Sequence, residues 1–119
     1  MGDNVQTFLE ASVRLNTKTL SLTRFQILTL LAYFKDGVQY RELKAALNIS
    51  DGKLISNLKL LRAMKYVDCF TVEMEKKNLD VYHLTKQGRE ELEKMTSWMK
   101  LAENLVQNVI TVGGEIIGE

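Results

Sequence analysis

The residues best suited to chemistry in this sequence are short polar and basic side chains on one face of a predicted helix. Lys53, Ser56 and Asn57 follow Ser50 at helical spacing, and Lys59 comes one turn later. Such side chains reach base edges when a helix enters the major groove of DNA, and an asparagine can pair with the edge of adenine. The pattern therefore predicts base contact. The spacing alone leaves open that Lys53 and Lys59 are ordinary solvated residues.

Backbone groups at the start of this helix offer a second kind of contact. Ser50 is a strong N-cap candidate because its hydroxyl can accept from the amides of the new first turn. The amides of Asp51 and Gly52 would then meet a phosphate at the helix N-terminus. Ser50 acting only as a cap is the simpler alternative. Ile55 and Leu60 either touch thymine methyl groups or belong to an interface that is not DNA.

Four basic residues and one asparagine outside this helix are further candidates for phosphate contact, which gives affinity rather than sequence choice. These candidates are Arg41, Lys44, Lys76, Lys77 and Asn78. The last three lie at the turn-prone tip between two strand-like runs, where Glu73, Glu75 and Asp80 would oppose phosphate. Alternation along a strand puts Glu73 and Glu75 on one face and Met74 on the other. Only convergence of the basic residues on one face would make them a site.

Several other chemistries are not expected. The chain has one histidine, His83, and one cysteine, Cys69, so a Cys/His metal site within one chain is not available. No glycine-rich phosphate loop follows a strand, and no Ser-His-Asp or Cys-His arrangement is assembled. We therefore expect neither an enzyme nor a cofactor.

Composition indicates a globular domain with at most local charge clustering. The 119 residues are 45% hydrophobic and 26% charged, with 16 basic and 15 acidic residues and a net charge of +1. That length fits one domain plus one extra helix. A single cysteine favours a reducing, cytoplasmic setting, and we expect neither a signal peptide nor a membrane span.

The elements that would position these residues can be read from periodicity and capping patterns. Asp3 with Gln6, and Thr23 with Gln26, fit capping boxes. We expect helices over 3–15, 23–34, 40–47 and KLISNLKLLRAMKYV, strands over 67–74 and 79–84 with a tip at 75–78, and a last helix capped by Thr85. The fold class is mainly α with a small β-hairpin (α+β). The expected divisions are an N-terminal helix and connection (1–20), a central domain (21–86), a C-terminal helix (87–112) and a flexible tail (113–119).

The C-terminal helix carries apolar residues in steps of three and four, which is a heptad seam. A helix running to about residue 109 extends beyond a small core, so a second copy of the chain is the simplest cover for its far half. Folding back on its own domain is the alternative. The expected dimer contacts are Phe8, Leu9, Leu92, Met95, Trp98, Met99, Ala102, Leu105, Val106 and Val109.

Two stretches resemble the winged helix-turn-helix transcriptional regulators of the ArsR/MarR type, most closely the small MarR-like subgroup common in archaea. They are LTRFQILTLLAYFKDGVQYRELKAALNISDGKLISNLKLLRAMKYV and VYHLTKQGREELEKM. The resemblance implies a homodimeric DNA-binding regulator, with the second helix of the motif in the major groove and the hairpin wing on the backbone. The chain departs from the pattern at Lys65, where such regulators usually have glycine. If Lys65 keeps a left-handed conformation, the cost is about 1 kcal/mol.

Two functions from different classes follow. The first is a homodimeric, sequence-specific regulator that binds double-stranded DNA, most simply a repressor. The second is a winged-helix module that docks a protein, which the near-neutral charge and the apolar Ile55 and Leu60 would allow.

Overall fold

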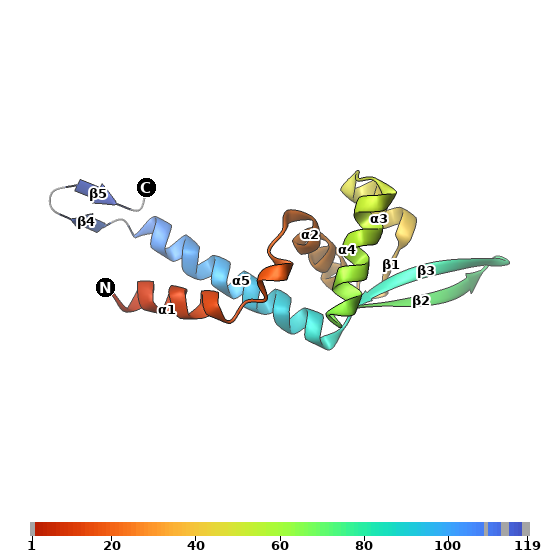
Figure 1. The fold of residues 1–119 in the computed structure, drawn as a ribbon, viewed down its shortest axis with the longest axis horizontal. Coiled ribbons are helices and arrows are strands. Elements are labelled where there is room, and N and C mark those ends of the chain that lie inside the picture. The colour runs from red at the N-terminus through yellow and green to blue at the C-terminus, as the bar shows by residue number, and fades with distance from the viewer. Residues whose placement is uncertain (1, 109, 113–114, 118–119) are drawn as a thin grey trace. The chain divides into compact units, whose positions relative to one another are not determined.

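The computed structural model describes residues 2–108, 110–112 and 115–117, and side chains over 2–108. Its elements are α1 (Asp3–Val13), the short 3-10 helix η1 (Thr17–Thr19), α2 (Leu22–Tyr33), β1 (Val38–Gln39), α3 (Tyr40–Leu47), α4 (Asp51–Ala63), β2 (Val67–Met74), β3 (Lys77–Leu84), α5 (Lys86–Gln107), β4 (Ile110–Val112) and β5 (Glu115–Ile117) (Figure 1). The chain divides into two compact units. One comprises residues 16–92, and the other comprises residues 1–15 with 93–119.

Side chains cap the first turns of α2 and α4 in the unit 16–92. Ser50 caps α4, since its hydroxyl accepts from the Lys53 amide at 3.2 Å, as predicted. Asn48 ends α3 in the left-handed conformation, at φ 52°. The predicted cap of α2 was wrong: Ser21, not Thr23, accepts from the Arg24 amide. Thr23 lies inside the helix and is buried.

The core of this unit is aliphatic and comes mainly from α2, α3 and α4. Its most buried side chains are Ile27, Leu28, Leu31, Leu43, Leu54, Leu58, Leu61 and Val67. One face of α4 is therefore buried, because Leu54, Leu58 and Leu61, spaced at i, i+4 and i+7, all point inward. Burial of one face leaves the opposite face of α4 free for a partner.

A buried carboxylate fixes the segment that leads into α2. Glu91 on α5 is 4% exposed and accepts from the Asn16 amide at 2.9 Å and from the Tyr66 hydroxyl at 3.4 Å. A buried charge needs such partners to offset its lost hydration. Glu91 on α5 thus joins the start of the unit to the segment between α4 and β2.

A three-stranded antiparallel sheet in the order β1-β3-β2 forms the wing. The tip is shorter than predicted. Met74 pairs with Lys77, so the turn consists of Glu75 and Lys76 at φ 50° and 66°, and Asn78 lies within β3 opposite Glu73. Two residues at positive φ make the turn whose twist matches that of the flanking strands. Gly37, at φ 93°, approaches the Val81 and His83 side chains of β3 so closely that a Cβ would clash.

Lys65, at the junction between α4 and the wing, adopts the left-handed conformation that the usual glycine would adopt. Lys65 has φ 67°, its amide donates to the Arg62 carbonyl, and the Tyr66 amide donates to the Leu61 carbonyl, each at 3.0 Å. These bonds form a Schellman motif with lysine where glycine is usual. The helix therefore ends with the usual backbone geometry, but the Cβ of Lys65 adds a steric cost that glycine would not have.

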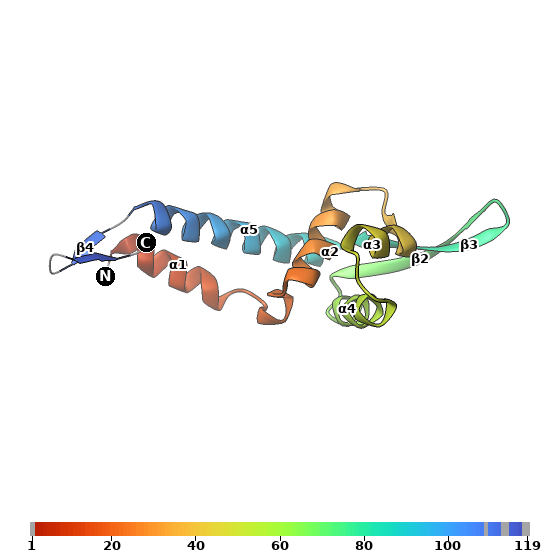
Figure 2. The ribbon, with the colours of Figure 1, turned by 90° about the horizontal axis from the view of Figure 1, so that it is seen from above.

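In the other unit, α1 packs along α5 (Figure 2). The Phe8 and Trp98 rings stack with centroids 5.7 Å apart, and the Trp98 indole donates to the Ser12 hydroxyl at 2.7 Å. The predicted capping box of α1 was wrong, because Gly2 is the N-cap and Asp3 is already helical. An acidic residue in the first turn still suits the helix dipole.

The last helix begins where it was predicted to begin, but it ends earlier than predicted. The Gly88 amide donates to the Thr85 hydroxyl at 2.9 Å, so the predicted cap of α5 is confirmed. The helix ends at Gln107, and β4 and β5 pair antiparallel in the segment that follows. β-branched residues in that segment favour strand over helix. Among the described residues, no helix is both long and apolar enough to cross a membrane.

Candidate nucleic-acid interface

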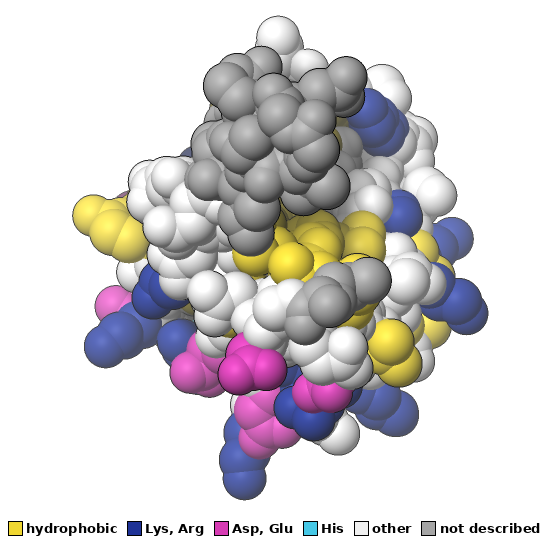
Figure 3. Space-filling model, turned by 90° about the vertical axis from the view of Figure 1, so that its left-hand side faces the viewer, with side chains coloured by type: hydrophobic (Ala, Val, Ile, Leu, Met, Phe, Trp, Pro, Cys, Tyr) yellow, Lys and Arg dark blue, Asp and Glu magenta, His cyan; other side chains and the backbone are white. Residues whose placement is uncertain are grey.

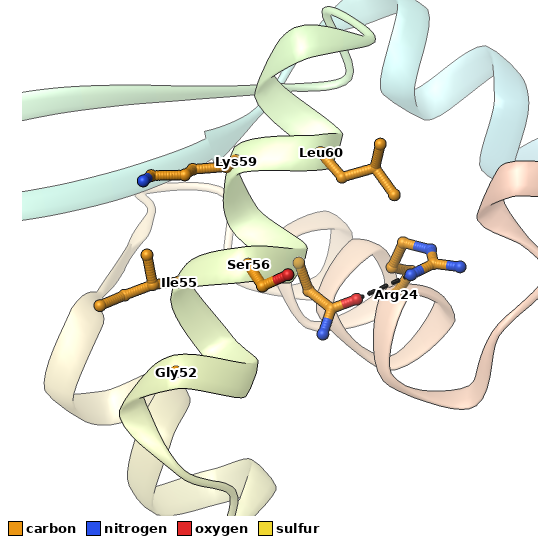
Figure 4. Close-up of a pocket in the computed structure, with 7 residues that line it drawn as sticks. Arg24, Gly52, Ile55, Ser56, Lys59 and Leu60 are labelled. Atoms are coloured by element: carbon orange, nitrogen blue, oxygen red, sulfur yellow. Dashed lines mark hydrogen bonds between the residues drawn. The ribbon is translucent and has the colours of Figure 1, made fainter.

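The exposed face of α4 collects most of the polar residues predicted to contact bases. Gly52, Lys53, Ser56 and Lys59 are exposed. Beside them an open hollow of about 700 Å³ is lined by Arg24, Gly52, Ile55, Ser56, Asn57, Lys59 and Leu60 (Figure 4). Cationic groups and a hydroxyl on one helix face suit the edge and backbone of a nucleic acid.

Arg24 is a site residue that the sequence analysis missed. It lies on α2, and its Nη1 donates to the Asn57 Oδ1 at 2.8 Å, while its Nε donates to the Lys18 carbonyl. The first turn of α2 contains no acidic residue. A cation in a helix's first turn is disfavoured by the helix dipole, so an arginine at this position was the one available sequence signal.

Asn57 is less free than predicted. Besides accepting from Arg24, its Nδ2 donates to the Lys53 carbonyl on its own helix at 2.7 Å. The residue is half-buried, whereas Ser56 next to it is exposed. Its amide is therefore held between α2 and α4. Pairing with an adenine edge would have to break these two hydrogen bonds.

The N-terminus of α4 is also engaged within the chain. Lys44 forms an ion pair with Asp51 at 2.9 Å, and the Tyr40 hydroxyl donates to the same carboxylate at 2.7 Å. The Tyr40 hydrogen bond, followed by that of Lys44, lowers the pKa of Asp51, and the same carboxylate raises the pKa of Tyr40. Ser50 is occupied by the Lys53 amide. A carboxylate thus stands where a phosphate was predicted, and it neutralises one predicted cation.

The wing presents two different faces. Thr71, Glu73, Asn78 and Asp80 share one face, because their strand positions are paired, and the Thr71 hydroxyl donates to the Asp80 carboxylate at 3.2 Å. Phe70, Val72, Met74, Lys77 and Leu79 share the other. Lys77 and Asn78 therefore lie on opposite faces, and Lys76 lies in the turn. The three residues predicted to contact phosphate are all near the tip of the wing, but they do not share one surface. Arg41 is exposed on α3.

The residues predicted at a dimer interface divide by exposure. Leu92 and Met95 are 8% and 1% exposed within the single chain, so they present little surface to a partner. Phe8, Trp98, Ala102 and Leu105 are half-buried, whereas Leu9, Met99 and Val106 are exposed. Val109 lies outside the described residues. Figure 3, seen from the left-hand side of Figure 1, shows hydrophobic side chains gathered on that face.

Comparisons with known proteins agree with this geometry. Residues 23–102 match the model of a family described as a winged helix DNA-binding domain. None of the curated proteins matches the chain. The fold is similar to that of MepR of S. aureus, solved as a DNA complex, with 18% identity, a TM-score of 0.66, and coverage of 87% of this chain and 79% of that chain.

Two further structures have the same fold. One is the transcriptional regulator Tm0710 of Thermotoga maritima, with 19% identity, a TM-score of 0.63, and coverage of 87% of this chain and 72% of that chain. The other is a PadR-like transcription factor of Bacteroides fragilis, with 21% identity, a TM-score of 0.58, and coverage of 88% and 98%. The family match extends over α2, α3, α4, the wing and most of α5. The chain therefore belongs to the winged helix DNA-binding domain family.

Proposed function

We propose that this chain is a homodimeric transcription regulator that binds double-stranded DNA in a sequence-specific way, with α4 in the major groove and the wing on the backbone. The observation that supports this most is the outward face of α4, where Lys53, Ser56 and Lys59 are exposed beside Arg24. A dimer occupying its site would exclude polymerase, so we propose repression as its effect. It would act in the cytoplasm, without a cofactor.

Gly52 supports a close approach of DNA to α4. A Cβ at this position would meet nothing within 4 Å, so packing inside the unit gives no reason for glycine. Glycine within a helix costs about 0.5–1 kcal/mol relative to alanine. A partner surface that must come near the backbone of the first turn is a physical reason to accept that cost.

Selection of bound sites from random duplexes tests the proposal directly. The full chain should enrich a two-fold symmetric sequence, because a symmetric dimer presents two copies of α4 to two half-sites. Lys53→Ala with Lys59→Ala should weaken binding to the enriched duplex by at least tenfold, since each removes a cation from the α4 face. Lys35→Ala is the control, because Lys35 lies just after the C-terminal end of α2 whereas Arg24 lies in its first turn. A pool without enrichment would contradict sequence specificity.

A protein-docking module is the second candidate function, and one surface favours it. The apolar face of the wing leaves Phe70 53%, Val72 38% and Met74 52% exposed. Exposed apolar surface of this kind often marks a protein interface. The two functions respond oppositely to salt, because phosphate contacts weaken as salt rises whereas burial of apolar surface does not.

A further inference from the structure

We propose that Arg24 is a phosphate-binding residue of the DNA interface and that Asn57 is a positioning residue for it, not a reader of adenine. This inference rests on the proposed DNA-binding function and assigns roles to two residues within that site. The argument starts from the guanidinium of Arg24, which carries its N–H donors in a fixed planar fork that matches phosphate oxygens.

The chain uses only part of that fork. Arg24 donates through Nε to the Lys18 carbonyl and through Nη1 to the Asn57 Oδ1. In the described part of the chain, no carboxylate forms an ion pair with it. Arg24 lines the hollow, and Ser56 lies between it and the axis of α4 (Figure 4). An arginine held at two points, with an uncompensated charge facing an open hollow, is preorganised for an anion.

Asn57 has the geometry of a support. Readout of adenine requires the amide oxygen and the amide nitrogen to point together at one base edge. Here the oxygen points to α2, where it accepts from Arg24, and the nitrogen donates to the Lys53 carbonyl behind it. The side chain thus links the two helices and fixes the direction of the guanidinium. Losing Asn57 would loosen Arg24 without removing a base contact.

The position of Arg24 gives an independent reason for a bound anion. It lies in the first turn of α2, where the helix dipole gives a partial positive charge and no acidic residue compensates it. A cation there repels that charge unless an anion is nearby. A DNA phosphate beside α4 would remove the repulsion and use the remaining donors of the arginine.

The test is a double-mutant cycle in the full chain, with Arg24→Ala, Asn57→Ala and the combination, measured on the preferred duplex, on its single-base variants and across salt concentrations. We expect Arg24→Ala to weaken binding about tenfold on every duplex and to reduce the salt slope by about one. Asn57→Ala should weaken binding less, keep the preference at every base pair, and add nothing to Arg24→Ala. Arg24→Lys should keep the salt slope but lose part of the affinity.

Two outcomes would overturn this inference while leaving the proposed function intact. The first is unchanged binding by Arg24→Ala. The second is an Asn57→Ala variant that loses preference at one base pair and is additive with Arg24→Ala. If the unaltered chain bound no duplex, the proposed function would fail and this inference with it. Thermal unfolding of each variant, together with Arg24→Lys, separates lost contact from lost fold.

Discussion

At the scale of single residues, contacts between helices remove some of the side chains that the sequence predicted for phosphate binding. These contacts depend on the packing of the helices, which the sequence does not reveal. Lys44 and Asp51 are seven positions apart across the turn between α3 and α4, and only the packing of these helices brings them to 2.9 Å. The period of α4 predicted which of its residues face out, and this is confirmed for Lys53, Ser56 and Lys59. Arg24 was not predicted, because its place beside α4 depends on how α2 packs.

Asp51→Asn should strengthen DNA binding. The substitution removes a negative charge at the N-terminus of α4 and releases the Lys44 ammonium to a phosphate. Affinity for duplex DNA should rise severalfold with a steeper salt dependence, measured by fluorescence anisotropy. Because the pKa of Asp51 is lowered in the folded chain, its small stabilising effect is present above the ordinary carboxyl pKa and is lost as pH falls through the lowered value. Lys44→Ala in the Asp51→Asn background should cancel the gain, and weaker binding by Asp51→Asn would refute this role.

Gly52→Gln should separate stability from binding. The substitution removes a glycine from α4 and meets no atom within 4 Å of the new Cβ, so the free energy of unfolding should rise by about 0.5–1 kcal/mol. Duplex affinity should fall at least tenfold, because the side chain stands where DNA must approach. Urea unfolding and anisotropy measure the two effects, with Gly2→Gln, also open around its Cβ, as the control. Full affinity in Gly52→Gln would show that nothing approaches this turn.

At the scale of elements, capping and periodicity predicted most helices, and turn geometry was the weaker part. Ser50 and Thr85 have their predicted roles because each acts on its immediate neighbours. The wing tip was predicted too long, since which residues of EKKN adopt positive φ depends on strand register. The far end of α5 was misplaced because an apolar helical pattern continues into a run of β-branched residues.

Lys65→Gly should stabilise the junction between α4 and β2. Lys65 is held at φ 67°, where glycine has no steric penalty, so the free energy of unfolding should rise by about 1 kcal/mol in urea denaturation. Lys65→Ala is the matched control, because it removes the same charge and keeps a Cβ. Equal stability of the two variants would mean that the backbone strain at this position is negligible.

At the scale of the whole molecule, the proposed dimer depends on the part of α5 that extends beyond Leu92. Leu92 and Met95 are buried within the chain, so a second copy would contact mainly the exposed Leu9, Met99 and Val106. The same apolar surface on a second copy of the chain would bury these exposed residues of α1 and α5 in a symmetric interface. The seam was predicted from sequence, whereas its inner members proved to belong to the chain's own core.

Met99→Glu with Val106→Glu should convert the proposed dimer into a monomer. Two buried carboxylates facing their symmetry mates would cost more than the apolar contact stabilises. Sedimentation velocity measures the change, and Met74→Glu on the wing, where Met74 is 52% exposed, is the control that should remain dimeric. A double variant that sediments as the unaltered chain would place the interface elsewhere.

The salt dependence of duplex binding by the unaltered full chain tests the central claim most directly. Regulation through DNA requires cations of α4, α2 and the wing to displace counterions from phosphates. We therefore predict that the logarithm of the association constant falls linearly with the logarithm of salt concentration, with a slope of several units. Binding that does not change with salt, or grows stronger, would contradict the DNA interface and favour docking of a protein on the apolar wing.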